Sequence, residues 1–200
     1  MQAIDAIRNA LKFSDMGMKH LAEMSDAPLL RPGPWGGNHA MWIAGHLTVV
    51  EGRLQKMLHG TPNPVEQWKP LFDWGSEPVD DPAAYPPYEE VLRKFKELRD
   101  QTHRFLDEVG EKGLDQPTKC QPPGFSGFDT VGSVILIIAC HACGHLGGLT
   151  VVRAAAGYRQ GVHLAPGAGL ERPPHHRRQG GFVLDVTDVI EADRRGRRLL

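Results

Sequence analysis

The chain of 200 residues is poor in cysteine, with only Cys120, Cys140 and Cys143. A small, odd number of cysteines in a chain of this length does not indicate a disulfide framework. The first ten residues lack the basic start and apolar run of a signal peptide. The longest apolar run, Val134 to Cys140, is much shorter than a membrane span. We therefore expect a reducing, cytoplasmic setting without membrane contact.

An excess of charge of one sign is also missing, because the formal net charge is −1. Proteins that bind nucleic acids or membrane surfaces through bulk electrostatics carry a basic excess or a basic stripe. The sequence also has no glycine-rich phosphate loop and no nucleophile elbow. These absences argue against a nucleic-acid partner and against the classes of enzyme that those motifs define.

Helical periodicity is present in four segments, separated by connections rich in proline and glycine. Apolar residues recur at spacings of three, four and seven, which predicts amphipathic helices over about 3–24, 38–58, 87–109 and 129–156. The fourth segment is the most apolar, which predicts that it is the most buried helix. A short strand at 182–186 would have no obvious partner.

Four helices and one long connection, residues 61–87, predict an all-α fold. The expected architecture is an up-and-down four-helix bundle with a long crossover connection. Asn38 is the expected N-cap of the second helix, and Asp129 or Thr130 that of the fourth. Gly157 is expected to lie just past the end of the fourth helix. The bundle domain is accordingly assigned to residues 1–157.

The composition changes in residues 158–200. This segment contains eight arginines and no lysine, whereas residues 1–157 contain seven arginines and eight lysines. It is rich in glycine, proline and histidine and has no helical period. Such a composition predicts a disordered C-terminal tail. Translation of a GC-rich segment out of frame is the alternative, and a metal-binding histidine tract is less favoured because its histidines are few and scattered.

Two histidines lie four residues apart in the fourth predicted helix. At 100° per residue, His145 lies about 40° from His141, on the same stripe as Val134 and Ile138. Imidazoles at this spacing on one helix face are close enough to bind one metal ion. Burial of two imidazoles in an apolar row is costly unless each has a partner, and a metal supplies one to both.

A third histidine lies on the inward side of the second predicted helix. His46 follows Ile43 by three residues and precedes Val50 by four. Three histidines from two facing helices, with open coordination positions, are typical of catalytic metal sites in bundles. For each histidine alone, the alternative is an ordinary hydrogen-bonded core residue. The set of three predicts a divalent metal site formed by His46, His141 and His145.

The spacing Cys140-His141-Ala142-Cys143 contains a CxxC motif, which elsewhere indicates a zinc or redox site. Here Cys143 lies about 200° from His141 and Cys140 about 260°, so neither shares the histidine face. A redox CxxC also needs a helix N-terminus to lower its thiol pKa, and this one is in mid-helix. We expect both cysteines to be small structural residues.

Two short segments resemble motifs of the DinB/YfiT-like family of metalloenzymes. The first is Trp42-Ile43-Ala44-Gly45-His46-Leu47, with Glu51 following. The second is His141-Ala142-Cys143-Gly144-His145-Leu146-Gly147-Gly148, with Arg153 and Gly157 near the helix end. In that family one histidine comes from the second helix and a pair from the last helix, and His46, His141 and His145 fall on those positions. The resemblance covers roughly residues 1–157.

The resemblance implies a helical bundle, often a homodimer, that binds a divalent cation such as zinc or nickel. Some members are similar to thiol S-transferases that use a low-molecular-weight thiol such as bacillithiol or mycothiol. Others resemble maleylpyruvate isomerases or the sulfur-handling domain of ergothioneine synthesis. The leading hypothesis is therefore a metal-dependent transferase that joins a low-molecular-weight thiol to a small electrophilic acceptor. A non-catalytic metal-binding, stress-associated bundle and a purely structural helical protein are the alternatives.

A glutamate, a further histidine and the tryptophans could each belong either to the predicted site or to the ordinary structure of the bundle. Glu51 is either a partner or base at the site or a solvated helix residue, because it lies about 140° from His46. His39 either lines the mouth of a pocket or begins the second helix. The four tryptophans, which are Trp35, Trp42, Trp68 and Trp74, either form pocket walls or pack in the core. Core packing is favoured for Trp42.

Overall fold

The computed structural model describes residues 1–34, 36–121 and 127–158, and the described residues are helical or irregular. The elements are α1 (Ala3–Ala22), α2 (Ala40–His59), η1 (Glu66–Trp68), α3 (Lys69–Phe72), η2 (Pro82–Ala84), α4 (Tyr88–Gly113) and α5 (Val131–Ala155). No strand occurs in this described part of the chain, so the predicted all-α class is confirmed. The tail from residue 159 onward and the strand suggested at 182–186 lie outside the described residues.

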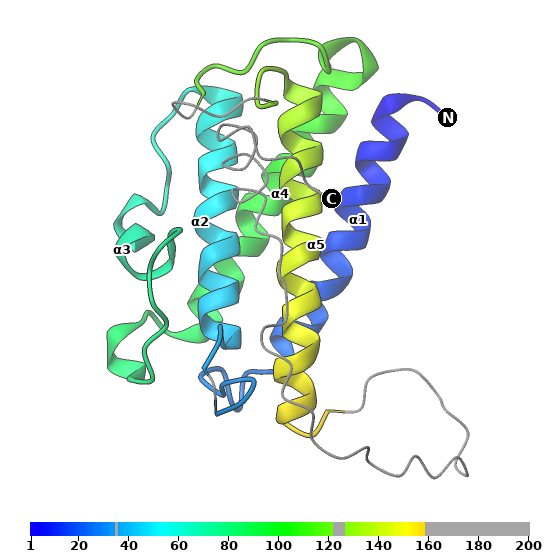
Figure 1. Cartoon of the computed structure of the whole chain (residues 1–200). Coiled ribbons are helices and arrows are strands. Elements are labelled where there is room, and N and C mark those ends of the chain that lie inside the picture. The colour runs from blue at the N-terminus through cyan, green and yellow to red at the C-terminus, as the bar shows by residue number, and fades with distance from the viewer. Residues whose placement is uncertain (35, 122–126, 159–200) are drawn as a thin grey trace, which may run out of the picture.

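Four long helices pack around one another: α5 lies between α1 and α2, and α4 packs against α2 and α1 (Figure 1). The connection between α2 and α4 returns along the outer side of α2, so these two helices run in the same direction (Figure 1). It contains three short helical turns, η1, α3 and η2. The region that the sequence marks only as a long connection is therefore a folded layer against α2.

The helix boundaries follow local capping rules, with one difference from the sequence-based expectation. α2 begins after His39, whose ring Nδ1 accepts a hydrogen bond from the backbone N–H of Trp42 at 3.0 Å. The prediction of Asn38 as N-cap is therefore wrong, because the imidazole of the next residue serves the same purpose. Thr130 caps α5 as predicted, in a reciprocal capping box with Ser133.

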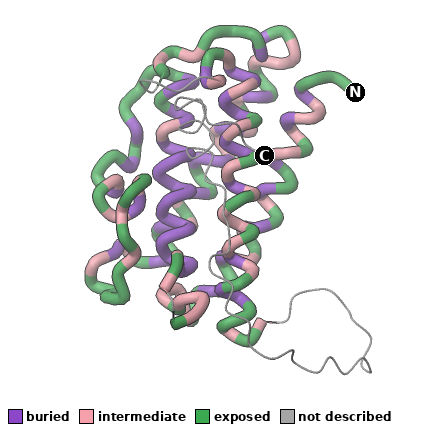
Figure 2. Tube along the Cα trace, in the orientation of Figure 1, coloured by how far each residue is buried: buried purple, intermediate pink, exposed green. Residues whose placement is uncertain are grey.

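α2 is the most buried helix, and the expectation that the fourth predicted helix would be is wrong. Of the 20 residues of α2, 17 are buried, against 10 of 25 in α5. Figure 2 shows α2 almost wholly buried and α5 with alternating buried and exposed turns. α2 is covered by α4, α5 and the α2–α4 connection, whereas no described segment covers the outer side of α5. High hydropathy indicates a preference for an apolar environment, but it does not say which surface supplies it.

α5 is the one helix in the described residues that is long and apolar enough to cross a membrane by length and composition. Its most apolar 18-residue window has a mean hydropathy of 1.9, and 33% of that window is buried. Core helices of water-soluble proteins meet the same criterion. In this structure α5 packs against both α1 and α2 (Figure 1).

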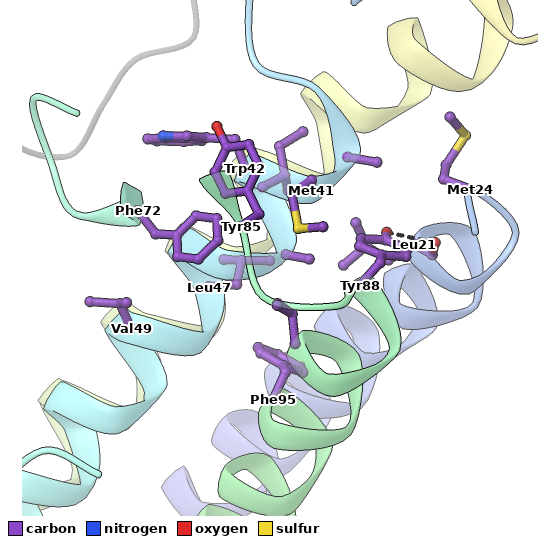
Figure 3. Packing of buried hydrophobic residues seen from close by; sticks show 14 of the residues in the cluster. Leu21, Met24, Met41, Trp42, Leu47, Val49, Phe72, Tyr85, Tyr88 and Phe95 are labelled. Carbon is purple, nitrogen blue, oxygen red and sulfur yellow. Dashed lines mark hydrogen bonds between the residues drawn. The ribbon is translucent and has the colours of Figure 1, made fainter. Parts of the chain in front are cut away.

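The α2–α4 connection inserts aromatic side chains against α2. Phe72 and Tyr85 are buried and stack with their ring centroids 5.3 Å apart (Figure 3). The ring of Phe72 lies directly over Gly45, where a Cβ atom would come within 2.2 Å of it. A glycine in α2 thus allows α3 to approach the helix backbone closely, one residue before His46.

Candidate metal centre

The three predicted histidines come together between α2 and α5. The Nε2 atoms of His141 and His145 are 3.0 Å apart, and those of His46 and His141 are 3.4 Å apart. One nitrogen from each of the three rings lies within 4.8 Å of the others. His46 is buried, and the other two are partly buried. The structure therefore brings together the full ligand set predicted from the sequence.

His46 is oriented by a backbone group of α3. Its Nδ1 lies 2.7 Å from the carbonyl oxygen of Phe72. Because a carbonyl only accepts hydrogen bonds, Nδ1 carries the proton and donates it. The lone pair is then on Nε2, which points toward His141. A hydrogen bond from the far ring nitrogen to a carbonyl is the usual way in which proteins fix the tautomer of a metal-binding histidine.

Trp42 forms an apolar wall beside the histidines. Its ring stacks on His46 with centroids 4.7 Å apart and an interplanar angle of 7°, and it lies 6.1 Å from the ring of His145. The indole N–H donates to the hydroxyl oxygen of Ser76 at 3.0 Å. Trp42 therefore both packs in the core, as expected, and restricts the rotation of His46. Its position four residues before His46 is a spacing from which such a contact can be predicted.

The arrangement of nitrogens fits a divalent ion. Zinc–imidazole bonds of about 2.05 Å in a tetrahedral site place neighbouring ligand nitrogens about 3.3 Å apart. The Nε2–Nε2 separations of 3.0 and 3.4 Å lie near this value. The Nε2 atom of His46 can only accept, because Nδ1 carries the proton of that ring, and the single Nε2 atom of His141 faces both other rings. A cation at the centre would accommodate the lone pairs of all three nitrogens. Nitrogen-only donors suit zinc and nickel and disfavour magnesium and calcium.

The protonation of the site also favours metal binding. Burial, followed by the proximity of His46 and His141, lowers the pKa of His145 from 6.5 to about 2. His145 therefore stays neutral well below neutral pH. A neutral imidazole has a lone pair available, which a metal ligand requires.

Glu51 does not have either of the roles considered from the sequence. Its side chain is 1% exposed, so the interpretation as a solvated residue is wrong. Its carboxylate lies 3.1 Å from the guanidinium of Arg99 and accepts a hydrogen bond from Thr102 at 2.5 Å, and both partners belong to α4. It is therefore part of a buried ion pair between α2 and α4 and is not one of the residues grouped around the histidines.

His39 begins α2 and does not line a pocket mouth. It is fully buried, and its Nε2 donates to the carbonyl of Val79 at 3.0 Å, which favours the helix-start interpretation.

The cysteines and the other tryptophans lie apart from the three histidines. Cys140 is exposed and Cys143 partly exposed, and neither joins the histidine group. Trp68 is buried against the core and Trp74 is 60% exposed. Trp35 lies outside the described residues.

A contact that sequence analysis did not identify is the Phe72 carbonyl. Every residue has a backbone carbonyl, so no sequence pattern distinguishes this one. The unusual length of the α2–α4 connection was the one available signal that this segment has a function of its own.

The fold and the histidine group together define an all-helical protein with a candidate metal centre between two facing helices. The comparison with protein families gives a more specific assignment. The family model of the DinB superfamily matches residues 15–149, a range that includes all three histidines. The chain therefore belongs to the DinB superfamily, as the sequence motifs indicate. A search of curated proteins found no match.

Proposed function

We propose that the chain is a four-helix-bundle metalloprotein of DinB type that binds one divalent ion, zinc or nickel, through His46, His141 and His145. The observation that carries this proposal is the convergence of three Nε2 atoms from α2 and α5, with neighbouring contacts of 3.0 and 3.4 Å. The hydrogen bond from His46 to Phe72 and the lowered pKa of His145 support it.

We further propose that the centre activates a low-molecular-weight thiol for transfer to a small electrophile. Three neutral histidine ligands would leave a bound divalent ion its charge and open positions, and the ion would then lower the pKa of a bound thiol and favour the nucleophilic thiolate. The chain's own residues prepare the site. Phe72 and Trp42 fix the ring of His46 from two sides, and Trp42 excludes water from one side of the histidines.

Cobalt substitution tests thiol binding directly. Adding a low-molecular-weight thiol such as N-acetylcysteine to the cobalt-loaded protein should produce a thiolate-to-cobalt charge-transfer band. The band should persist in Cys140→Ser/Cys143→Ser, because those side chains lie outside the histidine group, and should be absent from His145→Ala. A band that is present without added thiol and disappears in the double cysteine variant would instead indicate a mixed cysteine–histidine centre.

Turnover separates the transferase from a non-catalytic metal-binding bundle. With a chloroarene as acceptor, the thiolate sulfur forms a bond to carbon while the carbon–chlorine bond breaks and chloride leaves. We expect thioether formation that depends on bound metal and is lost in His145→Ala. Thiol binding without accelerated thioether formation over a panel of electrophiles would favour the non-catalytic alternative.

A further inference from the structure

A cleft of about 570 Å³ lies between α1 and α4, and none of the three candidate metal ligands lines it. The cleft follows from the packing of α1, which lies mainly against α5 and more loosely against α4. Two hydrogen bonds join α1 to α4 at its ends. The hydroxyl of Tyr88 donates to the carbonyl of Leu21 at 2.8 Å (Figure 3), and Nε2 of His103 lies 2.7 Å from the carboxylate of Asp15. A cleft of this size is large enough for a small organic ligand.

The middle of the cleft is apolar on both sides. Met18 and Ala22, one turn apart, supply the α1 wall, and Leu92 and Phe95 supply the α4 wall. Met18 and Leu92 are half-buried, and Ala22 is exposed. A methionine side chain is flexible and adapts its shape to a neighbouring apolar group. An apolar chain placed here would displace water from both walls, which favours its binding.

The carboxylates that line the cleft already have partners of opposite charge. Asp15 lies 2.7 Å from the ring of His103 and 3.6 Å from the guanidinium of Arg99. Asp100 lies 2.6 Å from the ammonium of Lys96. Because both negative charges are paired within the protein, the cleft does not call for a cationic ligand.

Arg93 is a cation of the cleft without such a partner. It is exposed on α4 and forms no ion pair with the residues that the structure describes. It lies three residues before Lys96, so two positive side chains flank the apolar walls along α4. A guanidinium binds a carboxylate through two parallel hydrogen bonds. The positive charge available at the edge of the cleft therefore favours an anionic group beside the apolar walls.

We propose that this cleft binds a free carboxylic acid with an unbranched apolar chain of medium length, such as octanoate. The carboxylate pairs with Arg93, and the chain lies between Met18 and Phe95. Arg93 precedes His103 by ten residues, about 15 Å along α4, so the Asp15–His103 pair limits the length of the chain. The cleft does not contain the three histidines, and its test is therefore independent of the proposed function.

Isothermal titration of octanoate into the full chain tests the proposal. We expect one octanoate per chain. Octan-1-ol keeps the apolar chain without the charge, and acetate keeps the charge without the chain. Each should bind at least about tenfold more weakly than octanoate, because each lacks one of the two interactions. Equal binding of octan-1-ol would contradict recognition by a cation, equal binding of acetate would contradict the apolar walls, and absence of octanoate binding would contradict both.

Two substitutions with matched controls locate the bound acid. Arg93→Glu should weaken octanoate binding by at least about tenfold, because it replaces attraction with repulsion. Arg104→Glu, at another exposed arginine of α4 that does not line the cleft, should have little effect. Ala22→Trp should also weaken binding, because it adds an indole at the apolar wall, whereas Lys19→Trp, at an exposed position outside the cleft, should not. Urea unfolding verifies that each variant is folded. Equal effects of a substitution and its control would place octanoate elsewhere.

Two further outcomes would overturn the proposal. A carboxylate can also bind a metal ion, so octanoate is titrated into His145→Ala, which should bind it as tightly as the wild type does. Loss of binding in that variant would place octanoate at the histidines. Sedimentation of the chain with phosphatidylglycerol vesicles, lost in Arg93→Glu and without binding of free octanoate, would identify a lipid surface as the source of the anion.

Discussion

At the scale of single residues, Glu51 lies close in sequence to a candidate metal-binding histidine but belongs to a buried ion pair with α4. It follows His46 by five residues on α2, but its partners, Arg99 and Thr102, are on α4. Arg99 in turn donates to the hydroxyl of Ser14 on α1 at 2.9 Å. The carboxylate therefore helps to connect three helices, and we expect its loss to affect stability rather than metal binding.

Glu51→Ala should lower the free energy of unfolding by about 3–5 kcal/mol, because it leaves the charge of Arg99 buried without its main partner. Metal content per chain should stay unchanged. Asp100→Ala is the control: it breaks an exposed pair with Lys96 and should cost less than about 1 kcal/mol. Urea unfolding measures both. A small loss of stability accompanied by loss of metal would instead make Glu51 part of the metal centre.

The pKa of His145 predicts a pH dependence of stability in the metal-free protein. Burial and the two neighbouring histidines lower this pKa to about 2 in the folded state, from 6.5 in the unfolded chain. The unfolded state therefore takes up the proton first as the pH falls. Above pH 6.5 His145 contributes no pH dependence, and below it the folded state loses stability, by about 2 kcal/mol at pH 5.

Comparison of wild type with His145→Gln isolates this contribution from that of the carboxylates. Between pH 7 and pH 5, urea unfolding should show that the wild type loses about 2 kcal/mol more than the variant. Equal losses in wild type and His145→Gln would show that His145 is freely protonated in the folded state.

At the scale of elements, sequence patterns predicted where the helices begin and end but not which segments cover them. Periodicity located α1, α2, α4 and α5 to within a few residues, because apolar residues recur at helical spacing in each and proline or glycine follows their ends. The same apolar content suggested that α5 would be the most buried helix. The outcome was the reverse, since α2 lies beneath the α2–α4 connection, and a connection without periodicity gives no indication of where it packs.

The contact between α3 and α2 gives a prediction at this scale. Gly45→Ala places a methyl group against the ring of Phe72, and overpacking of this kind typically costs 1–3 kcal/mol. The displaced α3 would also move the Phe72 carbonyl away from His46, so metal affinity should fall. Adding Phe72→Leu makes room for the methyl group while keeping the carbonyl, and should recover much of the affinity. Competitive titration with a chelator measures the metal affinity of each variant. Unchanged affinity in Gly45→Ala would show that this carbonyl does not matter.

At the scale of the whole molecule, the candidate metal centre was predicted from the sequence because its ligands obey helix geometry. His141 and His145 share a face through their spacing of four, and His46 lies on the inward row of the facing helix. Their orientation could not be predicted in the same way. The Phe72 carbonyl depends on tertiary contacts of the α2–α4 connection that carry no sequence signal.

Metal analysis of the purified full chain tests the central claim most directly. We expect about one zinc or nickel ion per chain in the wild type and essentially none in the variant with His46, His141 and His145 all changed to alanine. Circular dichroism would verify that this variant remains helical, and Cys140→Ser/Cys143→Ser should bind as much metal as the wild type. A folded triple variant that still carries one ion per chain would contradict the assignment of the metal to these three histidines.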